Sequence, residues 1–469
     1  MYSHRSVAGE EIPSEVLRAA SAGNGSIVLV IGAGCSVEAP TRLPLARPLA
    51  NKVERALVTD KVLVEGECPD PDDLSAVAES VYNKVGSQRP VVSRLPLDAM
   101  ATARPNKGTL LTAALMREGV VGCVLTLNYD MSIVHALSEV DAGNDVSILA
   151  GPEDHQRLGR TNLVFLHRNV YADAEDLIIR REQLESAWRD QWEHVVASRF
   201  LGGPATVFAG LGSPAAVLTE TMHWIMGALK NVKPTLVDPS HFDGSQFAKD
   251  LGLSEDEYVR APWSRFMELL SARVLVEHVR VLLGASDEFL QANRFPLEDL
   301  AGIAEQLQQL GLVECGRLRA NWILSDSQYE PLRAVDPRLL ADLICLVASV
   351  ERRTVSRATL SPSGVVYFVT QTGTAPVVLA TGGGIHRWAT VEATLRHRYA
   401  NAPFVAPGAP KPRFAVVAGV QGSQANIAPP IDIVGSFEHE SVVSGPDVLE
   451  LLDVDAVRNE DPLAMRLVS

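Results

Sequence analysis

The five cysteines of this sequence are scattered along it, and no two of them form a C-x-x-C pair. Neither a disulfide framework nor a structural zinc site is therefore expected. No apolar run approaches the roughly 18 residues of a membrane-spanning helix, and the first residues lack the apolar core of a signal peptide. We expect a cytoplasmic protein that holds no metal ion and has no membrane partner.

The sequence also has fewer positively than negatively charged residues. The 469 residues include 42 Lys and Arg against 57 Asp and Glu, which gives a formal net charge of -15. This balance argues against a general nucleic-acid-binding surface, so direct binding of nucleic acid is not expected. The hydrophobic content of 46% is sufficient for large packed cores, and the length suggests two or three domains.

Short apolar segments alternate with amphipathic ones from the N-terminus to about residue 282. The apolar segments are rich in Val, Ile and Leu without clear alternation, which is typical of strands buried on both faces. This order predicts an α/β fold, with a mostly parallel sheet and helices on both of its faces. The expected strands are 26–31, 122–127, 146–149, 163–167, 205–209 and 234–237, and the expected helices are 45–57, 73–85, 106–117 and 182–200.

The rest of the chain has a different pattern and predicts an α+β region. Residues 286–355 favour helices, and a helix over 303–313, a glycine stop and a strand over 317–324 would give a winged-helix-like module. A small structural or oligomerisation module is the interpretation we prefer, because the chain is acidic. Strand signals dominate 356–469, which we expect to be a β-rich domain for oligomerisation or partner binding. Residues 1–285 would then form the first domain.

A turn rich in glycine follows the first expected strand, with the sequence Gly32-Ala33-Gly34-Cys35-Ser36. Glycines after a buried strand let the backbone bend and bring its N–H groups close to a phosphate. The full dinucleotide fingerprint G-x-G-x-x-G is absent, because its third glycine would fall at Val37. An ordinary strand-to-helix turn is the alternative interpretation.

Polar side chains follow two further strands. Asn128 lies after the strand 122–127, and its amide can orient a water molecule or ribose hydroxyls, or cap a helix. Asp130 supports the same site or caps a helix over 131–139. His167 ends the strand 163–167 and can act as a general base near neutral pH. A histidine at a strand end is more often structural when nothing else accompanies it.

Together these segments resemble the Sir2 superfamily over roughly residues 20–285. The turn at 32–36 is similar to its G-A-G-x-S motif, residues 126–130 to its T-x-N-x-D motif, and Leu166-His167 to the L-H of its catalytic histidine motif. The resemblance implies a Rossmann-like sheet of the Sir2/DHS type that binds NAD as its substrate. It implies catalytic roles for Asn128, His167 and Asp130. It also implies NAD-binding roles for Gly32, Ala33, Gly34, Ser36, Pro44, Thr126, Gly210, Leu211, Gly212, Ser213 and Asp238.

Two departures from the family pattern matter. The family usually has glycine after its histidine, whereas this chain has Arg168, which could contact a phosphate. The loop 40–47 matches the protein deacylases clearly only at Pro44. In addition, sirtuin deacylases carry a four-cysteine zinc module after the N-x-D motif, and this chain has no cysteine between Cys123 and Cys315. The resemblance therefore points to the zinc-less Sir2-like NADase effectors of bacterial antiphage defence.

The expected function is that of an NAD+ glycohydrolase, which releases nicotinamide and ADP-ribose in abortive infection. The resemblance implies control by homo-oligomer assembly or by a companion such as a HerA-type ATPase or a short Argonaute. A regulatory subunit that binds NAD or ADP-ribose without turnover is the alternative. An NAD-dependent protein deacylase is the enzyme that the sequence supports least. Three tryptophans on helical faces are expected in the core: Trp188, Trp192 and Trp224.

Overall fold

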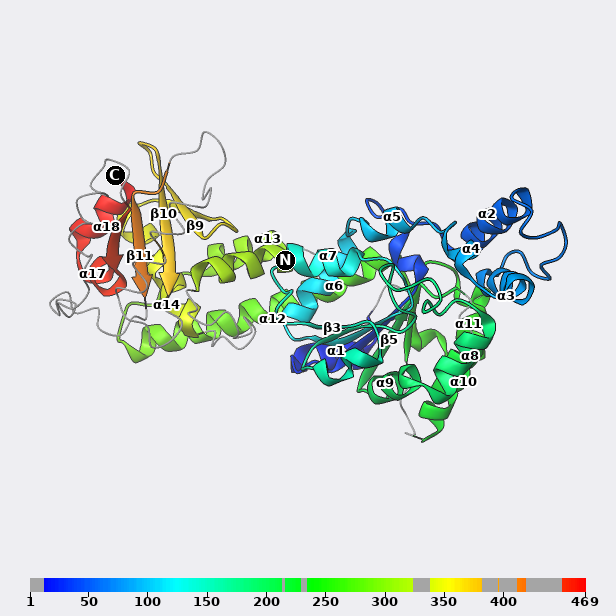
Figure 1. Cartoon of the computed structure of the whole chain (residues 1–469). Helices are drawn as coiled ribbons and strands as arrows, with labels where there is room; N and C mark the ends of the chain where they lie inside the picture. The colour runs from blue at the N-terminus through cyan, green and yellow to red at the C-terminus, as the bar shows by residue number, and fades with distance from the viewer. Residues whose placement is uncertain are drawn as a thin grey trace. The chain divides into compact units, whose positions relative to one another are not determined.

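A computed structural model describes residues 12–212, 216–228, 234–323, 338–381, 395, 411–418 and 449–469 (Figure 1). The chain divides into two compact units, Met1–Arg273 and Val274–Ser469. The division falls inside one helix, α12 (Trp263–Ala292). Among the described residues, no helix is both long and apolar enough to cross a membrane.

The first unit is built on a seven-stranded sheet in the order β3-β4-β2-β1-β5-β6-β7. Every neighbouring pair in it is parallel. The predicted α/β class is therefore confirmed, and the six expected strands are found within a residue or two of their expected ends. The short edge strand β7 was not expected. The strands are β1 (Ile27–Ile31), β2 (Val121–Thr126), β3 (Ser147–Leu149), β4 (Asn162–Phe165), β5 (Ala205–Ala209), β6 (Thr235–Asp238) and β7 (Tyr258–Arg260).

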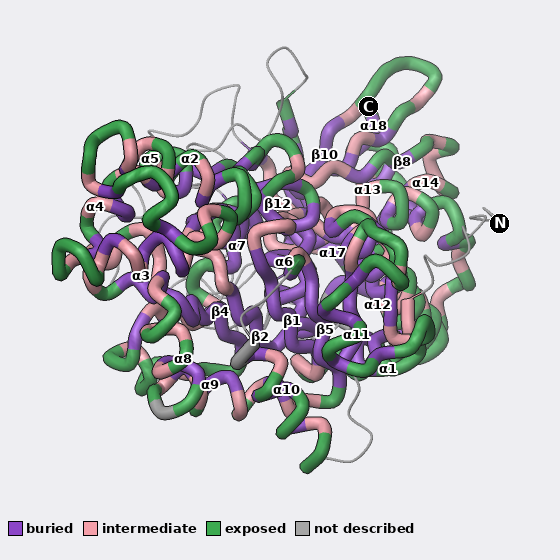
Figure 2. The backbone as a smooth tube through the Cα atoms, turned by 90° about the vertical axis from the view of Figure 1, so that its right-hand side faces the viewer, coloured by how far each residue is buried: buried purple, intermediate pink, exposed green. Residues whose placement is uncertain are grey.

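Burial explains why the central strands are mostly apolar. All residues of β1, β2, β4 and β5 are buried, and Figure 2 shows these strands as the most enclosed part of the unit. One face packs on α8 (Arg181–Asp190), α9 (Trp192–Leu201) and α10 (Ala216–Ala228) through a large apolar cluster. Helices α6 (Lys107–Arg117) and α7 (Ser132–Glu139) lie on the other side of the sheet (Figure 1). The single helix expected over 182–200 is two helices, because the backbone is extended at Gln191.

A second apolar cluster lies beside the sheet and supports the loops at one end of it. It joins the helices of residues 46–101 to the segment 170–179. These helices are α2 (Ala46–Thr59), α3 (Leu74–Val85), α4 (Arg89–Val92) and α5 (Leu97–Ala101). Further helices of the unit are α1 (Ser14–Ala22) and α11 (Gln246–Asp250).

The order of the strands creates a switch point between β1 and β5. After β1 the chain moves to β2 on one side, and after β5 it moves to β6 on the other. In open parallel sheets, ligands bind outside the carboxyl ends of the strands at such a point. The two glycine-bearing turns, at 32–36 and at 210–212, follow these two strands. The topology therefore places both turns where this fold class binds its ligands.

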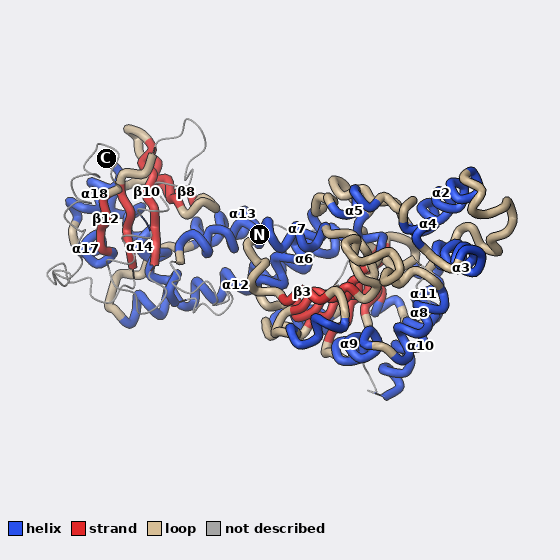
Figure 3. The backbone as a smooth tube through the Cα atoms, in the orientation of Figure 1, coloured by secondary structure: helices blue, strands red, loops and turns tan. Residues whose placement is uncertain are grey.

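The second unit contains a mixed five-stranded sheet in the order β12-β11-β10-β9-β8 (Figure 3). Strands β8 to β10 form an antiparallel meander, and β10, β11 and β12 are parallel. Its strands are β8 (Arg357–Leu360), β9 (Val365–Val369), β10 (Thr374–Thr381), β11 (Phe414–Ala418) and β12 (Glu450–Asp453). Its helices include α13 (Ala301–Trp322), α14 (Arg338–Thr354), α17 (Val454–Asn459) and α18 (Asp461–Val468).

The strand expected over 317–324 in a winged-helix-like module is wrong. Helix α13 breaks at Gly311, whose φ of 83° is left-handed, and the chain then becomes helical again up to Trp322. Leu318 and Trp322 are four residues apart and both buried, which is the spacing of one helical face. The indole N–H of Trp322 donates to the Gly364 carbonyl at 3.0 Å. Tertiary packing thus favours a second helix where the sequence pattern suggested a strand.

Candidate functional site

The glycine turn after β1 packs directly on the turn after β5. The N–H of Gly32 donates to the Ala209 carbonyl and that of Gly34 to the Gly210 carbonyl, both at 3.0 Å. A Cβ on Gly34 would lie 2.7 Å from the Gly210 Cα, and one on Gly210 would lie 2.5 Å from the Cys35 nitrogen. Gly210 also has a φ of 68°, a conformation that favours glycine. These glycines thus allow the two turns to touch, and the amides of Gly32 and Gly34 are engaged within the protein.

A chain of polar side chains connects this turn to the end of β2. The Asn128 side chain donates from Nδ2 to the Gly32 carbonyl at 3.0 Å and to Ser36 Oγ at 3.2 Å. The Ser36 hydroxyl in turn donates to Asp130 Oδ2 at 2.8 Å. Ser36 and Asp130 are both buried. The structure therefore brings Gly32, Ser36, Asn128 and Asp130 together at the carboxyl edge of the sheet.

The local backbone explains how Asn128 and Asp130 are held. The Asn128 N–H donates to Thr126 Oγ1 at 3.0 Å, at the last residue of β2. Asp130 Oδ1 accepts from the Ser132 N–H at 3.0 Å, at the first residue of α7. Met131, not Asp130, is the N-cap residue of α7. The expectation that Asp130 caps α7 is therefore wrong, and its carboxylate instead accepts from the Ser36 hydroxyl and from the Ser132 N–H.

His167 follows β4, the strand next to β2, and it is buried. Thr126 and Phe165 are register partners, so Asn128 and His167 each lie two residues beyond the same level of adjacent strands. The indole N–H of Trp188 donates to His167 Nε2 at 3.4 Å. Burial lowers the pKa of His167 to about 4, against the opposing effect of a hydrogen bond to the Leu127 backbone, and the Arg168 charge lowers it further. The ring is therefore neutral at pH 7.

Arg168, the residue after His167, has an unusual backbone conformation. Its φ is 70°, which costs a residue with a Cβ about 1 kcal/mol. Its guanidinium donates from Nη1 to Glu193 Oε1 at 2.6 Å and lies over the Trp192 ring. Glu193 is fully buried, while the Arg168 side chain is 16% exposed. The buried ion pair with Glu193 thus holds Arg168 in a left-handed backbone conformation that favours glycine.

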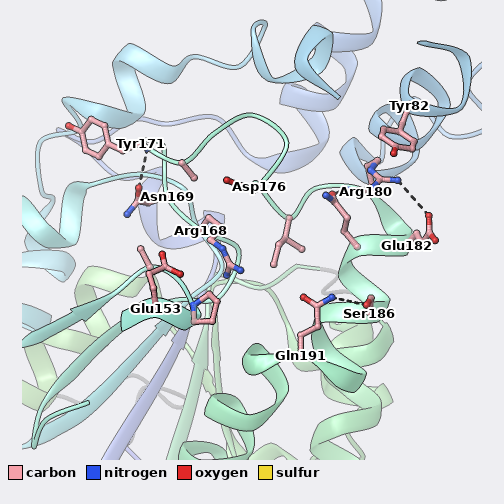
Figure 4. Close-up of a pocket in the computed structure, with 15 residues that line it drawn as sticks. Tyr82, Glu153, Arg168, Asn169, Tyr171, Asp176, Arg180, Glu182, Ser186 and Gln191 are labelled. Atoms are coloured by element: carbon pink, nitrogen blue, oxygen red, sulfur yellow. Dashed lines mark hydrogen bonds and ion pairs between the residues drawn. The ribbon is translucent and has the colours of Figure 1, made fainter. Parts of the chain in front are cut away.

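A cavity of about 790 Å³ opens beside this arginine. Figure 4 shows Arg168 near its middle, with Glu153 and Asn169 on one side and Arg180 on the other. Its walls come from α3, from the segments that follow β3 and β4, and from α8. The volume is in the range of small-molecule sites. The cavity thus lies next to the His167–Arg168 dipeptide rather than over the glycine turn.

Within the described part of the chain, the other expected NAD-binding residues lie in segments at or after the ends of β1, β5 and β6. The segment that contains exposed Pro44 is anchored by the Leu43 N–H, which donates to the Ser36 carbonyl at 2.9 Å. Leu211 is buried and Gly212 is exposed. Asp238 ends β6 and accepts from the Ser240 N–H at 2.7 Å. Ala33 starts the short 3₁₀ helix of the turn, and Ser213 lies outside the described residues.

Sequence reasoning did not predict the contacts that three residues make in or near this site. Trp188 is buried as expected, but its hydrogen bond to His167 was not foreseen. Glu193 and Tyr129 were not singled out, although the Tyr129 hydroxyl donates to the Ile178 carbonyl at 2.9 Å. Trp224 is 64% exposed, so the expectation that it belongs to the core is wrong. An apolar helical face indicates which side chains pack inward, but not which polar atoms they meet.

Among the described residues, no group of three or more His, Cys, Asp or Glu side chains is arranged to hold a metal ion. No protein-family model matches this chain, and no curated protein matches it either. Several solved structures are similar to it. One is a Sir2 homologue in complex with NAD, at 15% identity and a TM-score of 0.32, covering 58% of this chain and 97% of that one. Another is a mutant Sir2 homologue in complex with ADP-ribose, at 15% identity and a TM-score of 0.33, covering 56% and 96%. A third is a Sir2 protein bound to an acetylated peptide, at 16% identity and a TM-score of 0.28, covering 52% and 91%.

Proposed function

We propose that this protein is an NAD+ glycohydrolase. In the reaction the bond between the nicotinamide nitrogen and ribose C1′ breaks, and both electrons pass to the nitrogen, which becomes neutral. A water oxygen forms the new bond to C1′ and gives up a proton. The products are nicotinamide, ADP-ribose and a proton. The observation that carries the proposal is the Asn128–Ser36–Asp130 network at the switch point, with His167 at the equivalent place on the adjacent strand.

Asn128 is suited to hold the attacking water or the ribose hydroxyls. In the described part of the chain, both hydrogen bonds of its side chain are donated by Nδ2. Its Oδ1 is then the amide atom that accepts from a water or a hydroxyl. The donors on Nδ2 fix the amide plane, so this acceptor is preorganised rather than free to rotate.

His167 is suited to take the proton because its ring is neutral at pH 7. The two glycine turns at the switch point, with Ala33 at the start of the 3₁₀ helix, would face the pyrophosphate. Gly210, Leu211, Gly212 and Ser213 would lie toward the adenosine half, and Asp238 toward its ribose. Pro44 and Thr126 complete the proposed set.

Hydrolysis is favoured over protein deacylation because this chain has no cysteine between Cys123 and Cys315. The zinc module beside which sirtuin deacylases bind peptide therefore has no counterpart in the sequence. We further propose that the protein depletes NAD+ in the bacterial cytoplasm as an antiphage effector, under control of self-assembly or of a companion such as a HerA-type ATPase or a short Argonaute.

One observation favours a second candidate, a subunit that binds NAD or ADP-ribose without turnover. The Trp188 indole N–H donates to His167 Nε2. A neutral histidine has one nitrogen lone pair, and when that lone pair is engaged it has no free position for a substrate proton. Tight binding of NAD+ without release of nicotinamide would support this candidate.

The test is to incubate the purified full-length protein with NAD+ and to separate the products by chromatography. We expect equal amounts of nicotinamide and ADP-ribose, and at least a hundredfold slower release by Asn128→Ala and His167→Ala. Asn293→Ala is the matched control, because Asn293 is exposed, lies in the second unit and donates from its side chain to the nearby Phe289 carbonyl. If the control loses as much activity as Asn128→Ala, the proposed site is wrong.

A further inference from the structure

One hydrogen bond identifies which nitrogen of the His167 ring carries the proton. An indole N–H can only donate. Trp188 donates to Nε2 at 3.4 Å, so this nitrogen carries a lone pair. Burial keeps the ring neutral at pH 7, and a neutral imidazole has one N–H. That N–H is therefore on Nδ1.

We infer that Trp188 is a positioning residue for His167, whose indole N–H selects the neutral tautomer with the proton on Nδ1 and the lone pair on Nε2. This inference rests on the proposed function only for the catalytic use of Nε2. The tautomer itself follows from the Trp188 contact with a neutral ring. In the proposed reaction Nε2, which carries the lone pair, is then the nitrogen that accepts the proton.

The surroundings of the ring leave Trp188 as the group that determines the tautomer. The Tyr129 ring lies 6.5 Å from the His167 ring, centroid to centroid, and burial raises the pKa of its hydroxyl. Tyr129 is therefore a neutral neighbour, and its hydroxyl donates to the Ile178 carbonyl. Arg168 is the charged residue next to His167 in the chain. Its positive charge disfavours the protonated ring and acts on both neutral tautomers, and its guanidinium pairs with Glu193.

The segment that carries Trp188 also holds the residue after His167. Trp188 belongs to α8, and Trp192 and Glu193 are the first two residues of α9. One residue with an extended backbone, Gln191, separates the two helices. Trp188 contacts His167, while Glu193 and Trp192 contact Arg168. Trp188 is almost completely buried, and its ring meets the imidazole edge-on at 83°. Such packing keeps the N–H directed at Nε2.

The test is nitrogen NMR of the full-length protein with ¹⁵N-labelled histidine at pH 7. The His167 signals are assigned by their loss in His167→Ala. We expect Nδ1 to show the shift of a protonated nitrogen and Nε2 that of an unprotonated one. In Trp188→Phe, which keeps an aromatic ring but lacks the N–H, we expect the two shifts to move toward each other. The pKa of His167 should also rise, because the neutral ring loses a stabilising bond.

Trp192→Phe is the matched control. Its buried indole N–H has no hydrogen-bond partner in the described part of the chain, so the His167 shifts should not change. A proton on Nε2 in the unmutated protein, or unchanged shifts in Trp188→Phe, would overturn the inference. If Trp188→Phe does not fold, the indole proton of Trp188 is followed instead, and its signal should move on replacing His167 by Ala. None of these readouts depends on NAD+ turnover, so a failure of the proposed function is recognised separately.

Discussion

Burial and hydrogen bonding shift the pKa of the His167 imidazole in opposite directions. Burial dominates and lowers the pKa of His167 to about 4 from an ordinary value of 6.5. Below pH 6.5 the unfolded chain therefore binds a proton at His167 that the folded chain does not bind until the pH approaches 4. The stability associated with the neutral ring is complete above pH 6.5 and is lost as the pH falls through this window.

This linkage predicts that His167 makes the protein less stable by about 2 kcal/mol at pH 5 than at pH 7. Urea unfolding at the two pH values measures the difference, and His167→Gln should remove that part of it. An equal pH dependence in the variant would mean that the buried ring is not neutral. His135→Gln is the matched control, because it replaces a histidine that is partly exposed and lies in the same unit.

The Arg168–Glu193 pair predicts a cost for restoring glycine at position 168. Arg168→Gly relieves the left-handed backbone but leaves the fully buried Glu193 carboxylate without its partner. The second effect is larger, so we expect a net loss of about 2 kcal/mol in the free energy of unfolding. The double variant Arg168→Gly, Glu193→Gln should recover most of it. Greater stability of Arg168→Gly alone would show that the ion pair contributes nothing.

At the scale of the elements, the contact between the two glycine turns makes a prediction about Gly210. Alanine there would force a Cβ to within 2.5 Å of the Cys35 nitrogen at a φ of 68°. Since the obstacle is backbone rather than a flexible side chain, we expect a loss of about 3 kcal/mol or more. Gly212→Ala is the control in the same turn, because a Cβ there meets nothing within 4 Å. Thermal unfolding of both variants checks this, and a stable Gly210→Ala would contradict the tight contact.

The elements around the site could largely be predicted from sequence. The run 27–31 is apolar throughout and 205–209 is apolar except for Thr206, because both faces of the sheet are covered, and this pattern is visible without a structure. The polar residues that follow them, such as Asn128 and His167, could be placed at one edge for the same reason. The contact of Gly34 with Gly210 could not be predicted from sequence, because it joins residues 176 positions apart and depends on the order of the strands.

Other features depend on tertiary contacts that local patterns do not contain. The residues over 317–322 have acceptable helix and strand propensities, and the burial of Leu318 and Trp322 on one face decides between them. Glu193 looks like a surface residue of an amphipathic helix, yet it is fully buried against Arg168. Both cases are decided by partners distant in sequence.

At the scale of the whole molecule, a ligand that binds only the folded chain stabilises the unit that contains its site. We expect NAD+ to raise the free energy of unfolding of His167→Ala by about 2.7 kcal/mol at a concentration 100 times its Kd. This variant should retain the turns and the Asn128 network while it hydrolyses the ligand slowly. Denaturant unfolding with and without NAD+ measures the shift, and its absence would argue against an NAD site in either proposed function.

The most direct test of the central claim is the rate at which purified protein releases nicotinamide from NAD+, compared between the unmutated chain and Asn128→Ala. The account predicts release with an equal amount of ADP-ribose, reduced at least a hundredfold in the variant. Equal rates from the two proteins would contradict it, because the Asn128–Ser36–Asp130 network would then have no part in the chemistry.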